Sequence, residues 1–301
     1  MDFIWILFAF LCGLGVKLAG LPPLIGFLFA GFLLHFIGIQ PTEGLDILAD
    51  LGITLMLFTI GLKLHIKDLL KREVWASTLS HMGLWTLLFG SLALLLAILS
   101  TPYFTGFDLK TAALLGFAFS FSSTVCIIKL LEESGEMKTR HGQLAIGVLV
   151  MQDIAAVIFL VFATGKIPSI GALGLFGLLL ARPLLDRLLN KAGHGELLPL
   201  TGFFLALGGY ELFQLVGVKG DLGALIMGVL LSHHSKATEL TKALLSFKDI
   251  FLIGFFLSIG FTALPDWSML IAAMLLSLLI LVKFVMFFLI FTRLQLRSRT
   301  A

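Results

Sequence analysis

One acidic residue lies where an acid is energetically costly. Asp153 falls near the middle of residues 140–164, an apolar stretch of this 301-residue chain. Ionisable groups at mid-membrane depth are rare and by default mark function, because lipid penalises their charged form. A carboxylate at that depth can hold either a proton or a small cation, whereas a structural Asp would form a salt bridge that fixes helix packing. We interpret Asp153 as an ion- and proton-binding residue.

A lysine lies at similar depth in another apolar stretch. Lys283 is inside residues 267–292, too deep for its side chain to reach the membrane surface easily. It needs a carboxylate or backbone carbonyls as partner. Two interpretations stay open, namely a fixed charge that neutralises helix dipoles and a titrating member of the ion site.

Clustered hydroxyl groups predict an interrupted helix in the stretch 109–132. Ser122, Ser123 and Thr124 lie in its middle. Hydroxyl side chains can satisfy the backbone groups that a break exposes, so they permit a helix to unwind within the membrane.

A second interruption is predicted at Gly254 and Gly260, in the short stretch 248–262. Interrupted segments at corresponding places of two halves are typical of inverted-repeat transporters. The half-helix ends then meet at the membrane midplane and leave partial charges there. Asp153 and Lys283 are an acid and a base of the kinds that would neutralise these charges.

Composition determines the class of protein that must position these residues. The chain is 59% hydrophobic and only 13% charged, with a mean hydropathy of +1.08, whereas soluble domains carry roughly 25% charged residues. An apolar run of about 20 residues crosses a hydrocarbon core of about 30 Å. We therefore predict an all-α polytopic membrane protein, one transporter domain over residues 1–301 with its first helix retained. The expected segments, about eleven, are 2–18, 21–39, 46–63, 74–100, 109–132, 140–164, 167–190, 196–217, 220–233, 248–262 and 267–292.

The basic residues predict the orientation of the chain. With the N-terminus outside and the C-terminus in the cytoplasm, seventeen of the 21 basic residues fall on the cytoplasmic side, Lys248 among them. The positive-inside rule expects such asymmetry of a protein in an inner membrane. The formal net charge of +3 is explained by this topology and does not indicate nucleic-acid binding.

Several residues of reactive types are assigned no chemistry. Cys12 and Cys126 lie in apolar segments with no histidine at ligand spacing, which indicates neither zinc nor a disulfide framework. His81 lies near a segment end and is interpreted as unremarkable. We find no Ser/His, paired-Asp or metal-ligand set at suitable depth, so we expect no enzyme activity, no cofactor and no metal beyond a transported cation.

Seven features occur in order across essentially the whole chain, namely 52–64, 120–125, 145–156, 222–231, 247–249, 254–261 and Lys283. In this order they resemble the monovalent cation:proton antiporter-2 family, most closely its Kef-type potassium/proton antiporters. The resemblance implies a sodium/proton-antiporter-like fold with inverted repeats and two crossed, unwound helices. It also implies a panel of helices for homodimerisation.

The resemblance also implies residue roles and partners. The residues that correspond to the family's ion-binding carboxylate, unwound-helix hydroxyls and core lysine are Asp153, Ser122, Ser123, Thr124 and Lys283. Sodium-type relatives often carry two adjacent acids; here the first place is Gln152, as in the Kef pattern, which favours potassium without excluding sodium. Family members continue with about two more helices and often a nucleotide-binding regulatory domain. This sequence has neither, so we expect an incomplete core and a separate regulatory subunit as a partner.

The expected function is exchange of a monovalent cation, K⁺ or Na⁺, for protons by alternating access. A gated potassium efflux channel on the same scaffold is the first alternative, and it would be unable to move the cation uphill. An organic-anion carrier on a related crossed-helix fold is the second, and it would show a wide apolar cavity.

Overall fold

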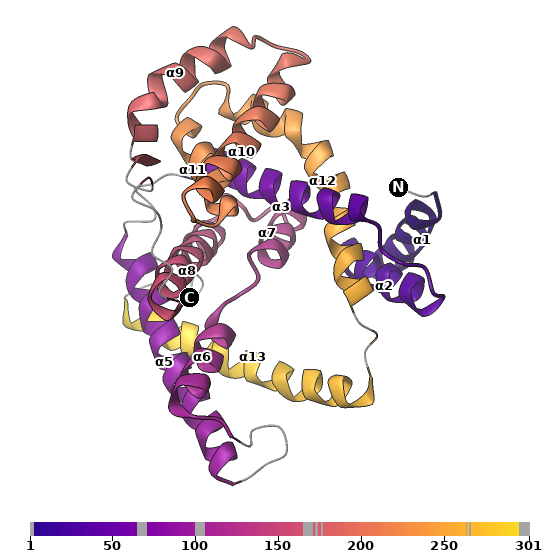
Figure 1. Ribbon diagram of the computed structural model, residues 1–301, viewed down its shortest axis with the longest axis vertical. Helices are drawn as coiled ribbons and strands as arrows, with labels where there is room; N and C mark the ends of the chain where they lie inside the picture. The colour runs from indigo at the N-terminus through magenta and orange to yellow at the C-terminus, as the bar shows by residue number, and fades with distance from the viewer. Residues whose placement is uncertain are drawn as a thin grey trace. The chain divides into compact units, whose positions relative to one another are not determined.

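The computed structural model describes residues 3–64, 71–99, 106–164, 171, 174–175, 177–262, 264 and 266–294. The regular elements of this part of the chain are helices joined by short turns (Figure 1). Their bounds are α1 Phe3–Leu18, α2 Pro23–Phe36, α3 Glu43–Lys63, α5 Arg72–Ile98, α6 Leu109–Ser120, α7 Thr124–Glu133, α8 Arg140–Thr164, α9 Gly177–Lys191, α10 Leu197–Leu215, α11 Gly220–Leu231, α12 Ala237–Thr262 and α13 Trp267–Arg293. The prediction of an all-α chain is confirmed.

Most predicted segments match a helix to within a few residues. The stretch 167–190 matches only from Gly177 onward, and its residues 167–170 lie outside the described part of the chain. The stretch 248–262 was predicted too short, because α12 begins at Ala237. Polar residues such as Lys242 and Lys248 made its first half resemble a loop, although Lys248 is only 1% exposed.

The surface of the helices is suited to lipid. By length and composition, the spans Glu43–Lys63, Arg72–Ile98, Leu109–Glu133 and Ala237–Thr262 are able to cross a membrane. Large apolar side chains project outward from the helices, for example Phe10 at 62% exposure and Leu87 at 71%. A surface this rich in exposed apolar side chains is stable in hydrocarbon and not in water. The protein is therefore a multi-pass membrane protein.

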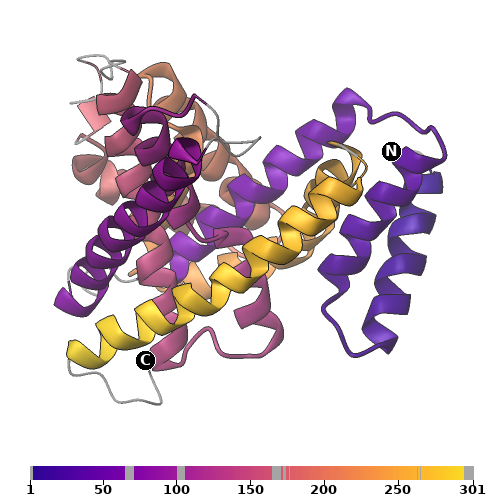
Figure 2. The same cartoon turned by 90° about the horizontal axis from the view of Figure 1, so that it is seen from below.

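The chain groups into two compact units. One comprises Met1–His65 and Val157–Pro265, and the other comprises Ile66–Ala156 and Asp266–Ala301, so that α8 contributes to both. In the first unit, α3 packs against α11 and α12, α2 packs against α12, and α1 pairs with α2. Figure 2 shows α1 and α2 as two neighbouring indigo helices.

Glycines set the close helix contacts of the first unit. A Cβ at Gly61 of α3 would collide with the backbone of Leu225 in α11, and a Cβ at Gly260 of α12 would lie 2.7 Å from the Cα of Gly31 in α2. Small residues allow helix backbones to approach this closely. The interruption predicted at Gly254 and Gly260 is wrong, because α12 is continuous from Ala237 to Thr262. These glycines serve helix packing.

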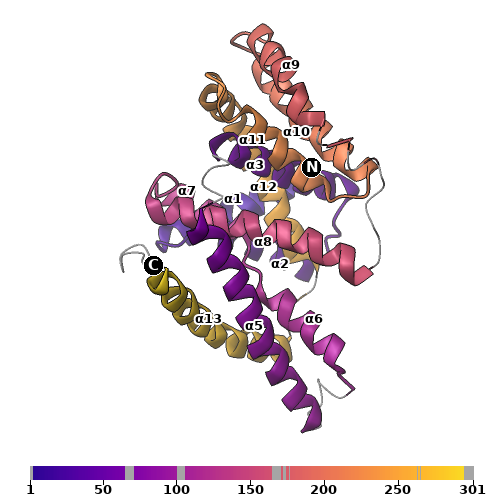
Figure 3. The same ribbon diagram turned by 90° about the vertical axis from the view of Figure 1, so that its left-hand side faces the viewer.

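The second unit holds α5, α6, α7, most of α8, and α13. Figure 3 shows α5 running beside α6, and both α6 and α13 contact α5 in this unit. Asp108 caps α6 by accepting a hydrogen bond from the Thr111 N–H at 2.8 Å. Hydrogen bonding by the Thr111 side chain, and then by the Thr111 N–H, holds the pKa of the exposed Asp108 carboxyl below its ordinary value.

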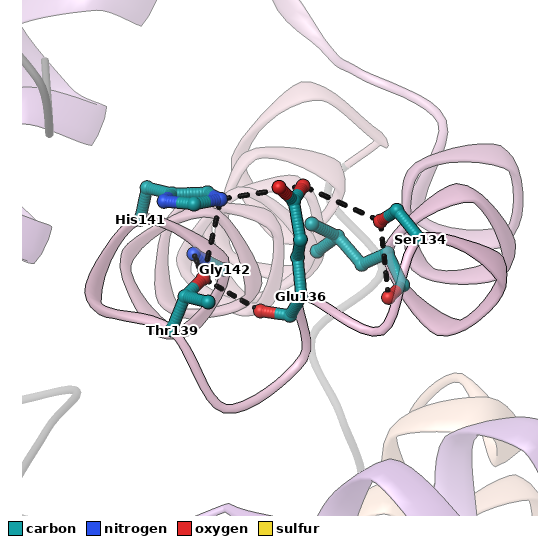
Figure 4. A network of polar contacts seen from close by, with 6 residues as sticks. Ser134, Glu136, Thr139, His141 and Gly142 are labelled. Carbon is teal, nitrogen blue, oxygen red and sulfur yellow. Dashed lines mark hydrogen bonds and ion pairs between the residues drawn. The ribbon is translucent and has the colours of Figure 1, made fainter.

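A tight polar turn joins α7 to α8. Gly135 adopts a positive φ of 73°, and the Glu136 N–H donates to the Leu131 carbonyl at 2.9 Å, which closes the end of α7. The Glu136 carboxylate lies 3.3 Å from His141 Nε2, and Thr139 Oγ1 donates to the Glu136 carbonyl at 2.7 Å (Figure 4). The turn holds the two helices that carry Thr124 and Asp153.

Two adjacent glycines of α10 test the packing of the first unit. A Cβ at Gly209 would lie 2.8 Å from the Gly223 carbonyl oxygen, whereas a Cβ at Gly208 meets nothing within 4 Å. We expect Gly209→Ala to destabilise the protein by about 1–3 kcal/mol through overpacking. Gly208→Ala should be neutral or stabilising by up to about 1 kcal/mol, because alanine favours a helix. Thermal unfolding of the two detergent-solubilised variants measures this difference, and equal midpoints would contradict it.

Candidate functional site

The helix of the predicted stretch 109–132 is interrupted as expected. It stops at Ser120, the chain continues in extended conformation through Phe121, Ser122 and Ser123, and α7 begins at Thr124. Figure 1 shows this extended chain between the α6 and α7 ribbons. A break in a span that crosses lipid exposes carbonyl and N–H groups, which then need partners inside the protein.

Gln152 of α8 satisfies both sides of this break. Its side-chain Oε1 accepts from the Ser122 N–H at 3.1 Å, and its Nε2 donates to the Ser120 carbonyl at 3.4 Å. The side chain is 1% exposed. A carboxylate in the same place would be unable to donate to a carbonyl. The two hydrogen bonds to the helix break therefore explain why position 152 carries an amide side chain.

Lys283 of α13 satisfies another carbonyl of the break. Its Nζ donates to the Phe121 carbonyl at 2.7 Å and lies 5.4 Å from the centre of the Trp85 ring. The hydrogen bond and the cation–π contact both stabilise an ammonium that is half-buried. Of the partners expected from the sequence, the structure thus shows a backbone carbonyl.

Asp153 faces the start of the second half-helix. Thr124 Oγ1 donates to Asp153 Oδ2 at 3.3 Å, and Asp153 is half-buried. Ser123 is the N-cap of α7, and its Oγ accepts from the Cys126 N–H at 3.3 Å. The predicted residues Ser122, Ser123, Thr124, Gln152 and Asp153 therefore lie together at the break.

The charges are divided between the two helix ends. The C-terminus of α6 carries a partial negative charge, and the Lys283 ammonium sits on the Phe121 carbonyl there. The N-terminus of α7 carries a partial positive charge, and the Asp153 carboxylate contacts its first residue, Thr124. Each charge thus lies at the helix end that stabilises it, although only one of the two helix interruptions expected from the sequence is present among the described residues.

Two cavities adjoin the break. One of about 320 Å³ is lined by Trp85, Phe121, Ser277 and Lys283 among others. Another of about 280 Å³ is lined by Ser122, His141, Phe287 and Phe291 among others.

Sequence reasoning missed two buried residues. His81 of α5 is fully buried, not at an unremarkable segment end, and its ring stacks on Phe287 with 3.8 Å between ring centroids. Lys248 of α12, assigned to the cytoplasmic side, is buried and lies 3.6 Å from the Asp249 carboxylate. The available signal for His81 was its position eight residues inside an apolar stretch. Gly254 and Gly260, which were predicted to form the second interruption, belong to the other compact unit.

Removing the Gln152 bridge tests the account of the break. We expect Gln152→Leu to destabilise the protein by about 1–3 kcal/mol, because it leaves the Ser122 N–H and the Ser120 carbonyl without their partner. Hydrogen exchange of residues 120–124, followed by mass spectrometry, should accelerate about tenfold or more. Gln214→Leu, at an exposed position of α10, is the matched control and should change stability by less than about 0.5 kcal/mol. Unchanged exchange at the break in Gln152→Leu would contradict the assignment.

Comparison with known proteins identifies relatives of the whole chain. Glutathione-regulated potassium-efflux system protein KefC of Shigella flexneri is 31% identical over 306 residues, covering 93% of this chain and 48% of that protein. The putative K⁺ efflux antiporter KefB of Alkalimonas amylolytica is 31% identical over 80% of this chain and 39% of its own length. The putative cation/proton antiporter YbaL of Escherichia coli is 28% identical over 84% of this chain and 49% of its own length.

The chain spans less than half the length of these three relatives. Residues 6–301 match the family described as sodium/hydrogen exchanger, transmembrane. The resemblance inferred from the sequence motifs is thereby confirmed. The chain belongs to the sodium/hydrogen exchanger transmembrane family, which is a family of cation/proton antiporters and not of enzymes.

Proposed function

We propose that this chain exchanges a monovalent cation for a proton at Asp153, with K⁺ as the favoured cation. The observation that carries the proposal is the contact between the Asp153 carboxylate and the Thr124 hydroxyl at the start of α7. It places an acid beside a helix break, where backbone and hydroxyl oxygens are also present.

One carboxylate is enough to couple the two ions. Asp153 with a bound proton and Asp153 with a bound monovalent cation carry the same net charge, so both loaded states cross the membrane at similar electrostatic cost. The empty carboxylate is a charge in a low-dielectric medium and crosses unfavourably. The proton and the cation therefore compete for one site, and each crossing requires one of them.

The break offers oxygen ligands for a dehydrated cation. Thr124 supplies a hydroxyl group in contact with Asp153, and Ser122 and Ser123 precede it in the break. Hard monovalent cations take carbonyl, hydroxyl and carboxylate oxygens. Within the described ranges, no group of three or more His, Cys, Asp or Glu side chains is placed to hold a metal ion. This donor set favours a transient cargo ion.

Two observations support K⁺ over Na⁺. The relatives KefC and KefB are named for potassium efflux. Gln152 leaves Asp153 without an adjacent acid, and its amide is engaged by the backbone of the break. A site with one negative charge binds a larger, more easily dehydrated ion with less penalty than a small one.

The membrane location, the orientation and the assembly of the chain are part of the same proposal. We place it in the inner membrane with its N-terminus outside and its C-terminus in the cytoplasm, on the distribution of its basic residues. We further propose a homodimer, as the family resemblance implies, and a separate regulatory subunit as a second partner. Cross-linking in membranes and co-purification test these two partners.

Replacing Asp153 tests the site. We expect Asp153→Asn to abolish cation-dependent proton flux in proteoliposomes, because the amide can hold neither the proton nor the cation. The control is Asp108→Asn, which keeps the N-cap of α6 and should transport normally. Titration of the detergent-solubilised chain with K⁺, Na⁺ and Li⁺ adds a binding readout, since each bound cation should release a proton from wild type and none from Asp153→Asn. Retained flux or proton release in Asp153→Asn would contradict the assignment.

Uphill movement separates exchange from a channel. With an imposed pH difference, the wild-type chain should accumulate K⁺ inside proteoliposomes against its gradient. A gated potassium channel can only dissipate a K⁺ gradient. Cation movement that always follows its own gradient would replace the exchanger by the channel.

The charge carried per cycle tests the role of Lys283. Because Lys283 is held on the Phe121 carbonyl and over Trp85, we expect it to stay charged, so that exchange is electroneutral. Solid-supported membrane electrophysiology should then record no net current during a flux that a pH dye detects. A current proportional to the flux would show that Lys283 also releases its proton in the cycle.

A further inference from the structure

His81 is a buried imidazole without a visible structural reason for its nitrogens. The side chain is 0% exposed, and within the described part of the chain neither Nδ1 nor Nε2 has a hydrogen-bond partner. Buried polar groups are nearly always paired, since leaving them unpaired is unfavourable. A phenylalanine would fill the same space and stack as well. The nitrogens therefore suggest a partner that binds in another state of the cycle.

The neighbours of His81 connect it to both cavities at the helix break. Phe287, whose ring stacks on His81 at 3.8 Å and 11°, lines the cavity shared with Ser122 and His141. Trp85, whose ring is stacked 6.1 Å from His81, lines the cavity shared with Lys283. Trp85 Nε1 is also buried without a partner among the described residues. His81 thus lies next to one wall residue of each cavity.

We propose that His81 is a proton-binding residue on the path between these two cavities, and that Phe287 is the side chain that moves to admit the proton. This inference rests on the proposed exchange function. One imidazole nitrogen takes a proton from a hydronium ion in the cavity that Phe287 lines, which leaves a water molecule there and forms an imidazolium. The other nitrogen releases its proton to a water molecule in the cavity at Lys283, which becomes a hydronium ion. The ring is neutral again with its tautomer reversed, and a ring flip or return of the proton resets it.

In the described part of the chain, the charged and titratable groups to consider for His81 lie on α5, α6, α8 and α13; on α8, His141 lines the same cavity as Phe287. Lys283 lies one helical turn from Phe287 on α13, which packs against α5. On α5 itself, Glu73 lies two turns away and pairs with Arg140 of α8 at 3.3 Å. On α6, Ala112 lies next to Gly90 of α5, which is nine residues from His81 along that helix. Lys110, near the start of α6, is therefore not a close neighbour of His81. The ammonium of Lys283 is therefore the charge whose state most affects a proton on His81.

A phenylalanine at position 81 separates packing from proton binding. We expect His81→Phe to fold and to unfold at the same temperature as wild type or higher. Its cation-dependent proton flux should fall tenfold or more, and the pH profile should lose its step between about pH 5 and 8, where imidazole titrates. The control is His35→Phe in α2, where Nδ1 is likewise buried and unpaired among the described residues but lines neither cavity. It should leave rate and profile unchanged.

Accessibility gives a second readout that needs no transport. Diethylpyrocarbonate modifies neutral imidazole nitrogens, and peptide mass spectrometry reads each histidine separately. We expect His81 to react slowly in wild type and at least tenfold faster in Phe287→Ala, with the His35 rate the same in both. Equal His81 rates would overturn the role of Phe287, and a His81→Phe variant with wild-type rate and pH profile would overturn the role of His81. Loss of flux in wild type itself would instead contradict the proposed function.

Discussion

The chain leaves its helical path at Phe121–Ser123, and in a membrane each backbone group freed there must be satisfied by the protein. Gln152 and Lys283 provide the partners from two other helices, α8 and α13. These contacts set how α6, α7, α8 and α13 come together within their unit. The helix break thus determines which side chains of the neighbouring helices gather around it.

The same break separates the acid from the base. Lys283 stabilises the C-terminal end of α6, and Asp153 faces the N-terminal end of α7. The two side chains of opposite charge thus contact different ends of the interrupted helix, and each lies at the end whose partial charge stabilises it.

The helix packing away from the break follows a different principle. In the first unit, Gly61, Gly209 and Gly260 allow backbones to touch, because helices in lipid gain little from burying apolar side chains and rely on close contact. In the second unit, aromatic rings of α5 and α13 fill the space beside the break. His81 is embedded among these rings, so its polar atoms are enclosed by the residues that also line the cavities.

The sequence alone determined the helical membrane class, most helix bounds, the break at Ser122 and the choice of Asp153 and Lys283 as candidate site residues, because apolar run length and charge within an apolar run are local properties of a chain in lipid. Tertiary structure decided what these residues touch. The amide of Gln152 proved to bridge the break, and Gly254 and Gly260 proved to lie in a continuous helix, since a glycine permits both a break and a close contact. The burial of His81 and Lys248 likewise depends on which helices pack against them, and this is a non-local property that one-dimensional patterns do not contain.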